Sequence, residues 1–110
     1  MASDFIITNV LKENGFEIDE CSGMEPHYVS ADTPLVQTLL AVYADVKGEK
    51  GEPIAEGGIT YVHNTEGGVA FGAEFPWENN NMHGADEHIS IETLKINLNM
   101  YANAIARLCR

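Results

Sequence analysis

Basic residues are scarce in this sequence, and their scarcity limits the partners that the surface can bind. Six lysine and arginine residues stand against 17 aspartate and glutamate residues, which gives a formal net charge of -11 over 110 residues. Such a surface repels the phosphates of nucleic acids and of anionic lipids, and it has no basic stripe to offset that repulsion. We therefore expect no nucleic-acid partner and interpret the scattered carboxylates as a solubilising surface.

Cysteine and long apolar runs are also scarce. The two cysteines, Cys21 and Cys109, lack a CxxC or other metal-ligand spacing. Free thiols in a reducing cytoplasm are the first interpretation, and a bridge between the two residues stays open as an alternative. No apolar run approaches the ~18 residues that a membrane-spanning helix needs. These absences predict a soluble, cytoplasmic protein without a membrane partner.

The remaining composition is typical of a folded chain. Apolar residues make up 45% of the sequence and charged residues 21%, which argues against a disordered or fibrous protein. The length suits one domain of ordinary size. A stretch of Gly, Pro, Ser and Asp between Gly23 and Thr33 has no clear periodicity and predicts a connector between two structural units.

Three segments have the apolar periodicity of helices. Each begins at a residue that can cap a helix N-terminus, and these residues are Ser3, Thr33 and Ser90. Gly15 and Gly48 end the first two helices, and Pro34 suits the first position of the second. The second helix has apolar residues at helical spacing: Leu35, Val36, Leu39, Leu40, Tyr43 and Val46. The third has a continuous apolar stripe, which we expect to be core or a partner surface: Ile91, Leu94, Leu98, Tyr101, Ile105 and Leu108.

Two further segments have the alternation of strands. Residues 16–20 alternate apolar and acidic side chains, and residues 69–75 place their larger apolar side chains on one face. A short apolar pair at residues 54–55 is cut off by paired glycines. Together with the helices, these segments predict a mixed α/β fold.

The polar loop from Pro76 to Glu87 contains the first candidate for metal chemistry. His83 follows the second predicted strand, and Asp86 and Glu87 lie close behind it as possible outer-shell carboxylates. A zinc site needs three or four donors, so a solvent-facing loop histidine stays open as the alternative. The sequence contains no His-x-Asp, H-E-x-x-H or Glu-Glu motif and no nucleophile signature. His63 and His88 are weaker candidates.

Several motifs occur in a fixed order along the chain. They are Gly57-Gly58-Ile59-Thr60-Tyr61, Gly68-Val69-Ala70-Phe71-Gly72, Phe75-Pro76, His83 and Asp86-Glu87-His88-Ile89-Ser90-Ile91. In this order they resemble the final part of the bacterial PepV-type and Xaa-His dipeptidases. These enzymes belong to the co-catalytic zinc metallopeptidases, with carnosinases, aminoacylases and succinyl-diaminopimelate desuccinylases.

The resemblance implies a C-terminal fragment of an α/β zinc-peptidase catalytic domain, together with the last helix and strand of an inserted lid domain. Residues 1–28 would end this lid, or dimerisation-type, domain, and residues 29–110 would complete the catalytic domain. His83 would be a ligand of one of two zinc ions. The substrate, a dipeptide or small peptide, would contact four residues of the glycine-rich turn: Gly57, Gly58, Thr60 and His63.

The chain departs from the family pattern in two respects. His63 stands where the dipeptidases have an arginine thought to hold the substrate carboxylate, and an imidazole is a shorter anchor than a bidentate guanidinium. Ile59 replaces the usual third glycine. The family's other zinc ligands, its bridging aspartate and its catalytic glutamate lie in an N-terminal part that this sequence does not contain. We therefore expect no catalytic residue in the chain, weak zinc binding at most, and no activity of the chain alone.

Three hypotheses follow for the function. The first is a portion of a zinc dipeptidase, from a longer enzyme or a truncated gene. The second is a non-catalytic binding or assembly module that keeps the family's C-terminal fold. The third is a split enzyme that reassembles with an N-terminal companion chain. Self-association also stays open, because exposed strand edges would invite pairing with a second copy.

Overall fold

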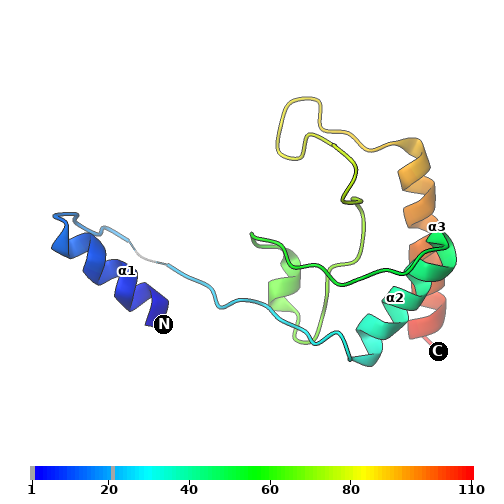
Figure 1. Ribbon diagram of the computed structural model, residues 1–110, viewed down its shortest axis with the longest axis horizontal. Coiled ribbons are helices and arrows are strands. Elements are labelled where there is room, and N and C mark those ends of the chain that lie inside the picture. Colours follow the sequence, from blue (N-terminus) through cyan, green and yellow to red (C-terminus); the bar gives the residue numbers. More distant parts are fainter. Residues whose placement is uncertain (1, 21) are drawn as a thin grey trace.

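The computed structural model describes residues 2–20 and 22–110, and within these ranges all regular secondary structure is helical. The helices are α1 (Ala2–Glu13), α2 (Pro34–Lys47), the short 3₁₀ helix η1 (Tyr61–Asn64) and α3 (Ile91–Leu108). Figure 1 shows α1 standing apart from a body that contains the other three, joined to it by an extended segment. The Cα radius of gyration is 18.8 Å, against about 13 Å for a compact chain of this length. The chain is therefore extended, with one small packed region.

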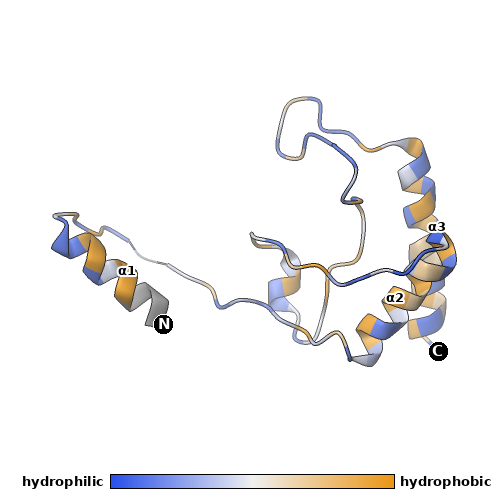
Figure 2. Cartoon of the chain, in the orientation of Figure 1, coloured by the Kyte–Doolittle hydropathy of each residue, from blue (hydrophilic) through white to orange (hydrophobic). Residues whose placement is uncertain are grey.

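Helix α1 has an apolar face that nothing in the described part of the chain covers. It begins at Ala2, so the predicted cap Ser3 lies inside the helix. The structure does not describe the side chain of Ser3, and it does not describe Cys21. Its apolar residues are between 37% and 61% exposed: Ile6, Ile7, Val10 and Leu11. Figure 2 shows them as orange bands on an isolated helix. Because α1 packs on neither α2 nor α3, these side chains contribute nothing to the core.

Helix α2 begins and ends where the sequence predicts. The Thr33 side chain accepts a hydrogen bond from the backbone N–H of Val36 at 3.5 Å, and Pro34 occupies the first turn. At the other end, the Gly48 N–H donates to the Ala44 carbonyl at 2.8 Å, with Gly48 in the left-handed conformation. These local interactions satisfy backbone groups that a helix end otherwise leaves unpaired.

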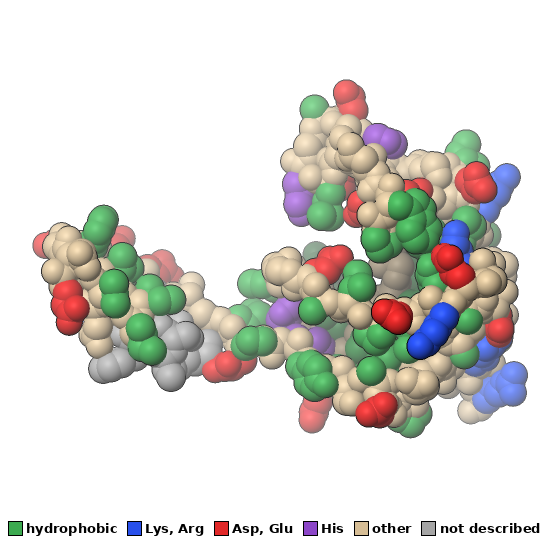
Figure 3. Space-filling model, viewed as in Figure 1, with side chains coloured by type: hydrophobic (Ala, Val, Ile, Leu, Met, Phe, Trp, Pro, Cys, Tyr) green, Lys and Arg blue, Asp and Glu red, His purple; other side chains and the backbone are tan. Residues whose placement is uncertain are grey.

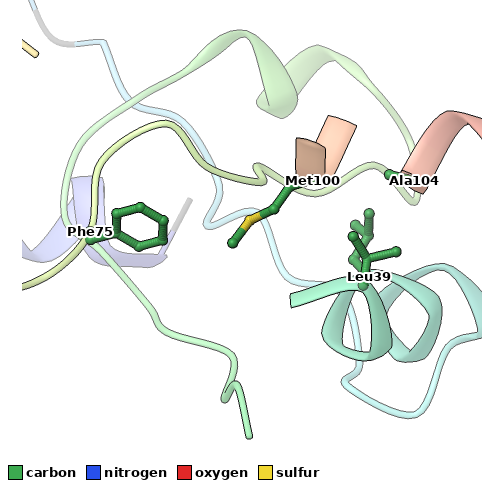
Figure 4. Packing of buried hydrophobic residues seen from close by; sticks show 5 residues of the cluster. Leu39, Phe75, Met100 and Ala104 are labelled. Carbon is green, nitrogen blue, oxygen red and sulfur yellow. The ribbon is translucent and has the colours of Figure 1, made fainter. Parts of the chain in front are cut away.

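The core lies between α2 and α3 and includes one residue from the preceding loop. Its buried residues are Leu39 and Val42 of α2, Met100 and Ala104 of α3, and Phe75. Figure 4 shows Met100 between Phe75 on one side and Leu39 with Ala104 on the other. The α2 pattern predicted most of this contact surface but missed Val42, which has no exposed surface. Such a small core leaves much apolar surface of the chain exposed.

Helix α3 buries a different face from the one that its apolar stripe predicts. Its buried residues are Thr93, Asn97, Met100 and Ala104, each at most 6% exposed. Met100 and Ala104 join the core with α2, whereas Thr93 and Asn97 hydrogen-bond to Glu78 and Ala73 of the preceding segment. The predicted stripe is instead between 37% and 73% exposed along its whole length: Ile91, Leu94, Leu98, Tyr101, Ile105 and Leu108. The stripe is therefore not part of the core of this chain.

The predicted mixed α/β fold is wrong, because residues 2–20 and 22–110 contain no β-strand. Alternation along residues 16–20 and 69–75 indicates which side chains share a face, but a strand also needs a neighbour that pairs its backbone N–H and C=O groups. Neither segment has such a neighbour in the part of the chain that the structure describes. Gly72 also adopts a positive φ of 76°, which interrupts the extended backbone.

Helix α3 holds residues 69–75 in place of a neighbouring strand. The Asn97 side-chain amide donates to the Ala73 carbonyl at 2.6 Å, and the Tyr101 hydroxyl donates to the Phe71 carbonyl at 3.1 Å. Side chains thus satisfy two backbone carbonyls of the segment. This arrangement fixes the start of the loop that carries His83.

Candidate functional site

The loop that carries the predicted metal ligand is anchored at both ends. At its start, Phe75 is buried in the core and Trp77 stacks on it, with ring centroids 4.9 Å apart. The Lys47 ammonium lies 4.8 Å from the Phe75 ring centroid and 5.0 Å from that of Trp77, a favourable cation–π geometry. At its end, the Ser90 hydroxyl caps α3 by accepting from the Thr93 N–H at 3.0 Å. The loop is therefore held by side chains outside its polar middle.

A hydrogen-bond chain joins the two anchors. The Ser90 hydroxyl donates to the Thr93 hydroxyl at 2.9 Å, and the Thr93 hydroxyl donates to a carboxylate oxygen of Glu78. The other oxygen of Glu78 accepts from the Phe75 N–H at 3.4 Å. A charged acceptor strengthens such bonds. Glu78 therefore links the two ends of the loop through hydrogen bonds to Phe75 and Thr93.

His83 lies at the exposed tip of this loop. Its φ is 62°, and Asn81 and Asp86 also have positive φ values, 53° and 57°. The Gly84 N–H donates to the Asn81 carbonyl at 2.7 Å and closes the turn around His83. Left-handed conformations are unfavourable for non-glycine residues and concentrate at functional sites. No hydrogen bond among the described residues uses the His83 ring, so both ring nitrogens remain available to a ligand.

The neighbours of His83 do not complete a metal centre. His88 contributes its Nδ1 to a 2.7 Å hydrogen bond with the Asp86 carbonyl, and its backbone N–H donates to the Asn80 carbonyl at 3.0 Å. Within the described ranges, no three histidine, cysteine or carboxylate residues lie close enough together to hold a metal ion. Zinc needs three or four protein donors. The described residues therefore do not form a complete zinc site around His83.

The predicted substrate residues lie around the start of η1. Thr60 caps this short helix by accepting from the Val62 N–H at 3.3 Å. His63 Nδ1 lies 3.3 Å from the Thr60 backbone N and 3.2 Å from its carbonyl O. The Thr60 backbone therefore engages Nδ1 in either tautomer, and Nε2 is the nitrogen left for a ligand. Gly57 and Gly58 are exposed just before this cap, and Gly58 has a φ of 116°.

The structure adds His27 to this group. Its Nε2 lies 2.7 Å from the Gly68 carbonyl O, so Nε2 carries the hydrogen and donates it. The rings of His27 and His63 lie 5.5 Å apart, centroid to centroid, at 48°, and both side chains are half-buried. Sequence analysis missed His27 as a site residue because 36 positions separate it from His63 and no local spacing links them.

The structure does not bring His83 together with the predicted substrate residues. Figure 1 shows the loop around residues 79–88, in yellow, at the top of the view and η1, in light green, below it and apart from it. Figure 3 shows histidine side chains on the upper lobe of the visible face and, separated from them, in the lower part of the body. A pocket of about 220 Å³ is lined by neither group. The stacked rings of Phe75 and Trp77 and the Glu78 carboxylate form part of its lining. The full set of lining residues is Lys47, Phe75, Trp77, Glu78, Ser90, Glu92, Thr93 and Ile96.

The helices that the structure describes do not include one that could span a membrane. None of them combines the length and the apolar character that crossing a bilayer requires.

Comparison with curated proteins finds relatives named as dipeptidases. The chain is 43% identical over 95 residues to "Putative dipeptidase YtjP" of Bacillus subtilis (strain 168), which covers 86% of the chain and 20% of that protein. It is 36% identical over 102 residues to "Putative dipeptidase SH1171" of Staphylococcus haemolyticus, covering 93% of the chain and 22% of that protein. It is 37% identical over 101 residues to "Putative dipeptidase SAUSA300_1697" of Staphylococcus aureus (strain USA300), covering 92% of the chain and 22% of that protein.

The chain thus spans about a fifth of the length of the curated relatives that it matches. No family model matches the chain, and no solved structure matches it. The relatives support the predicted likeness to dipeptidases at this coarse level. The PepV-type subfamily, zinc dependence and the roles of individual residues stay predictions.

Proposed function

We propose that this chain is the C-terminal portion of a zinc-dependent, cytoplasmic dipeptidase and that it supplies one zinc ligand and part of the substrate site. The likeness to the Bacillus protein named as a dipeptidase, 43% over 86% of the chain, carries the proposal. The exposed position of His83 on an anchored loop supports it, because a metal ligand must be reachable and held in place. The division into residues 1–28 and 29–110 remains part of the same proposal.

His83 is the zinc ligand in this proposal. An imidazole is a preferred zinc donor, and the His83 ring is free to bind one ion through either nitrogen. Because one donor cannot hold zinc against water, the remaining ligands and the catalytic glutamate come from the other part of the dipeptidase. The chain alone therefore neither holds catalytic zinc nor hydrolyses peptides.

The turn before η1 binds the polar ends of the peptide substrate. The exposed backbone at Gly57 and Gly58 allows close approach, and the Thr60 hydroxyl lies beside it. His63 keeps Nε2 free to donate to the substrate carboxylate. This single donor binds a carboxylate less strongly than a bidentate guanidinium does. We therefore expect weaker carboxylate recognition than in relatives that carry arginine at this position.

A chimera tests the proposal directly. The chain replaces the matched segment of the Bacillus protein, and hydrolysis of an unblocked dipeptide such as alanyl-alanine is measured with zinc present and with the intact Bacillus protein as reference. We expect the chimera to be active and His83→Ala to lower kcat/KM by roughly 100-fold or more, because loss of a ligand exceeds the effect of losing its outer-shell partner.

The matched control in the chimera is His88→Ala. His88 lies on the same loop, but its Nδ1 is already bonded to the Asp86 carbonyl. We expect this variant to keep most of the activity. A folded, inactive chimera, or a His83→Ala variant as active as His88→Ala, would contradict the proposed role.

A non-catalytic assembly module is the second candidate. The observation that favours it is the exposed apolar surface of α1 and α3 in a chain whose described residues lack a three-donor metal cluster. This candidate predicts a folded chimera without peptidase activity, so the same assay separates the two.

A further inference from the structure

Helix α3 has one face that is buried in the structure and a second, apolar face of the kind that proteins usually bury. The described residues leave this second face largely exposed. The face that packs on α2 and on the segment of residues 71–78 is partly polar: Thr93 and Asn97 are 4% and 2% exposed, and the Asn97 Oδ1 atom has no hydrogen-bond partner among the described residues. Met100 and Ala104 complete this face. A helix normally buries its most apolar face and keeps polar residues outside. In α3 the polar residues are buried and the most apolar face is left outside.

The exposed face is a continuous stripe of large side chains, which we call the α3 stripe. Its members and exposed fractions are Ile91 73%, Leu94 56%, Leu98 69%, Tyr101 37%, Ile105 62% and Leu108 43%. At about 100° per residue the stripe is turned by about a right angle from the buried face, and it runs for about 27 Å. Large contiguous apolar surfaces of this kind mark sites of protein contact.

Two observations identify what covers the α3 stripe. The relatives match most of this chain but have about four fifths of their length outside the match, so each of them contains a large polypeptide beyond the matched segment. A second copy is disfavoured, because it would bring together two chains that each carry a formal charge of -11. The remaining dipeptidase polypeptide therefore suits the stripe better than self-association does.

We infer that the α3 stripe packs against an apolar surface of the other four fifths of the dipeptidase, so that α3 becomes a helix buried between two layers; this inference rests on the proposed function. The partner surface is aliphatic or aromatic and has no unpaired charge opposite Leu98, since burying such a charge is costly. In this arrangement α2 and the partner contact different faces of the same helix.

Two adjacent substitutions provide the test. Leu98→Asp adds a charge to the stripe, and Asn99→Asp adds the same charge to the neighbouring exposed position outside it. In the isolated chain we expect both variants to keep the helix content and thermal midpoint of the parent, because Leu98 is 69% exposed there. In the chimera with the Bacillus protein we expect Leu98→Asp to lower the thermal midpoint by roughly 5 °C or more and Asn99→Asp to change it little.

A binding measurement with separate chains complements these variants. The probe is the Bacillus protein without its matched segment, titrated with this chain in a calorimeter. Binding that Leu98→Asp weakens at least roughly tenfold and Asn99→Asp leaves unchanged supports the inference. Equal thermal midpoints for the two chimera variants would overturn it. An isolated chain that forms a dimer in light scattering, dissociated by Leu98→Asp, would overturn it by assigning the stripe to a second copy.

The outcomes separate this inference from the function on which it rests. An active chimera whose stability does not respond to Leu98→Asp contradicts the inference and leaves the dipeptidase proposal intact. An inactive chimera that Leu98→Asp destabilises contradicts the dipeptidase proposal and leaves the contact surface established.

Discussion

Replacing Gly72 by alanine tests the contact through which α3 holds the segment before the His83 loop. Gly72 has a φ of 76°, and a Cβ atom placed on it would lie 2.5 Å from the Tyr101 hydroxyl and 3.1 Å from Asn97 Oδ1. Gly67 is the matched control, because its φ is 70° and a Cβ atom there would meet nothing within 4 Å. Both substitutions place alanine in the left-handed conformation, but only the substitution at Gly72 brings a Cβ atom into contact with Tyr101 and Asn97.

The magnitudes follow from these contacts. Gly67→Ala costs about 1 kcal/mol, the penalty for alanine in the left-handed conformation. Gly72→Ala has the same penalty and must also move Tyr101, whose hydrogen bond to the Phe71 carbonyl contributes about 1 kcal/mol. Displacing buried Asn97 weakens its 2.6 Å bond to the Ala73 carbonyl, which costs at least as much. We expect a loss of about 3 kcal/mol for Gly72→Ala.

Urea unfolding measures this difference. Circular dichroism reports the helices, and the fluorescence of Trp77, the single tryptophan, reports the segment that follows Gly72. In a Tyr101→Phe background the clash with the hydroxyl is absent, so Gly72→Ala should cost less there than in the parent chain. Equal losses for Gly72→Ala and Gly67→Ala would refute the proposed contact between α3 and this segment.

Two further predictions concern the α2–α3 unit. Met100→Ala should lower the free energy of unfolding by about 2–5 kcal/mol because Met100 is 1% exposed, whereas Leu98→Ala at an exposed position should cost far less in the same urea experiment; similar losses would contradict the packing. Burial raises the pKa of Tyr43, and the hydrogen bond and charge of Glu49 raise it further. The folded state therefore holds the Tyr43 hydroxyl proton more tightly than the unfolded state does. The resulting contribution to the free energy of unfolding is complete below about pH 10 and is lost as pH rises through the raised pKa. Urea midpoints between about pH 8 and 11 should fall less in Tyr43→Phe than in the parent, and identical pH profiles would contradict this assignment.

The sequence predicted both ends of α2 and the start of α3 because helix capping is local. Thr33, Pro34 and Gly48 act within one turn of the helix end that they define, and Ser90 caps α3 in the same way. The loop around His83 was also predictable, since its polar and glycine residues disfavour regular structure. These features require no knowledge of distant parts of the chain.

The sequence could not predict which surfaces meet. The alternation in residues 69–75 suggested a strand, but pairing depends on a neighbouring strand that the described chain does not contain. The α3 stripe was predicted to be core or partner surface, and periodicity could not distinguish the two. The structure leaves the stripe outside the core, and its role as a partner surface stays a prediction. The contact of His27 with His63 spans 36 positions and was missed for the same reason.

The most direct test of the central claim is the zinc content of this chain, of the chimera and of its His83→Ala and His88→Ala variants after equilibrium dialysis. The claim predicts no stoichiometric zinc on the isolated chain, zinc in the chimera approaching the two ions that the family resemblance implies, and loss of at least one ion in His83→Ala but not in His88→Ala. Tightly held zinc on the isolated chain, or equal zinc in the two variants, would contradict it.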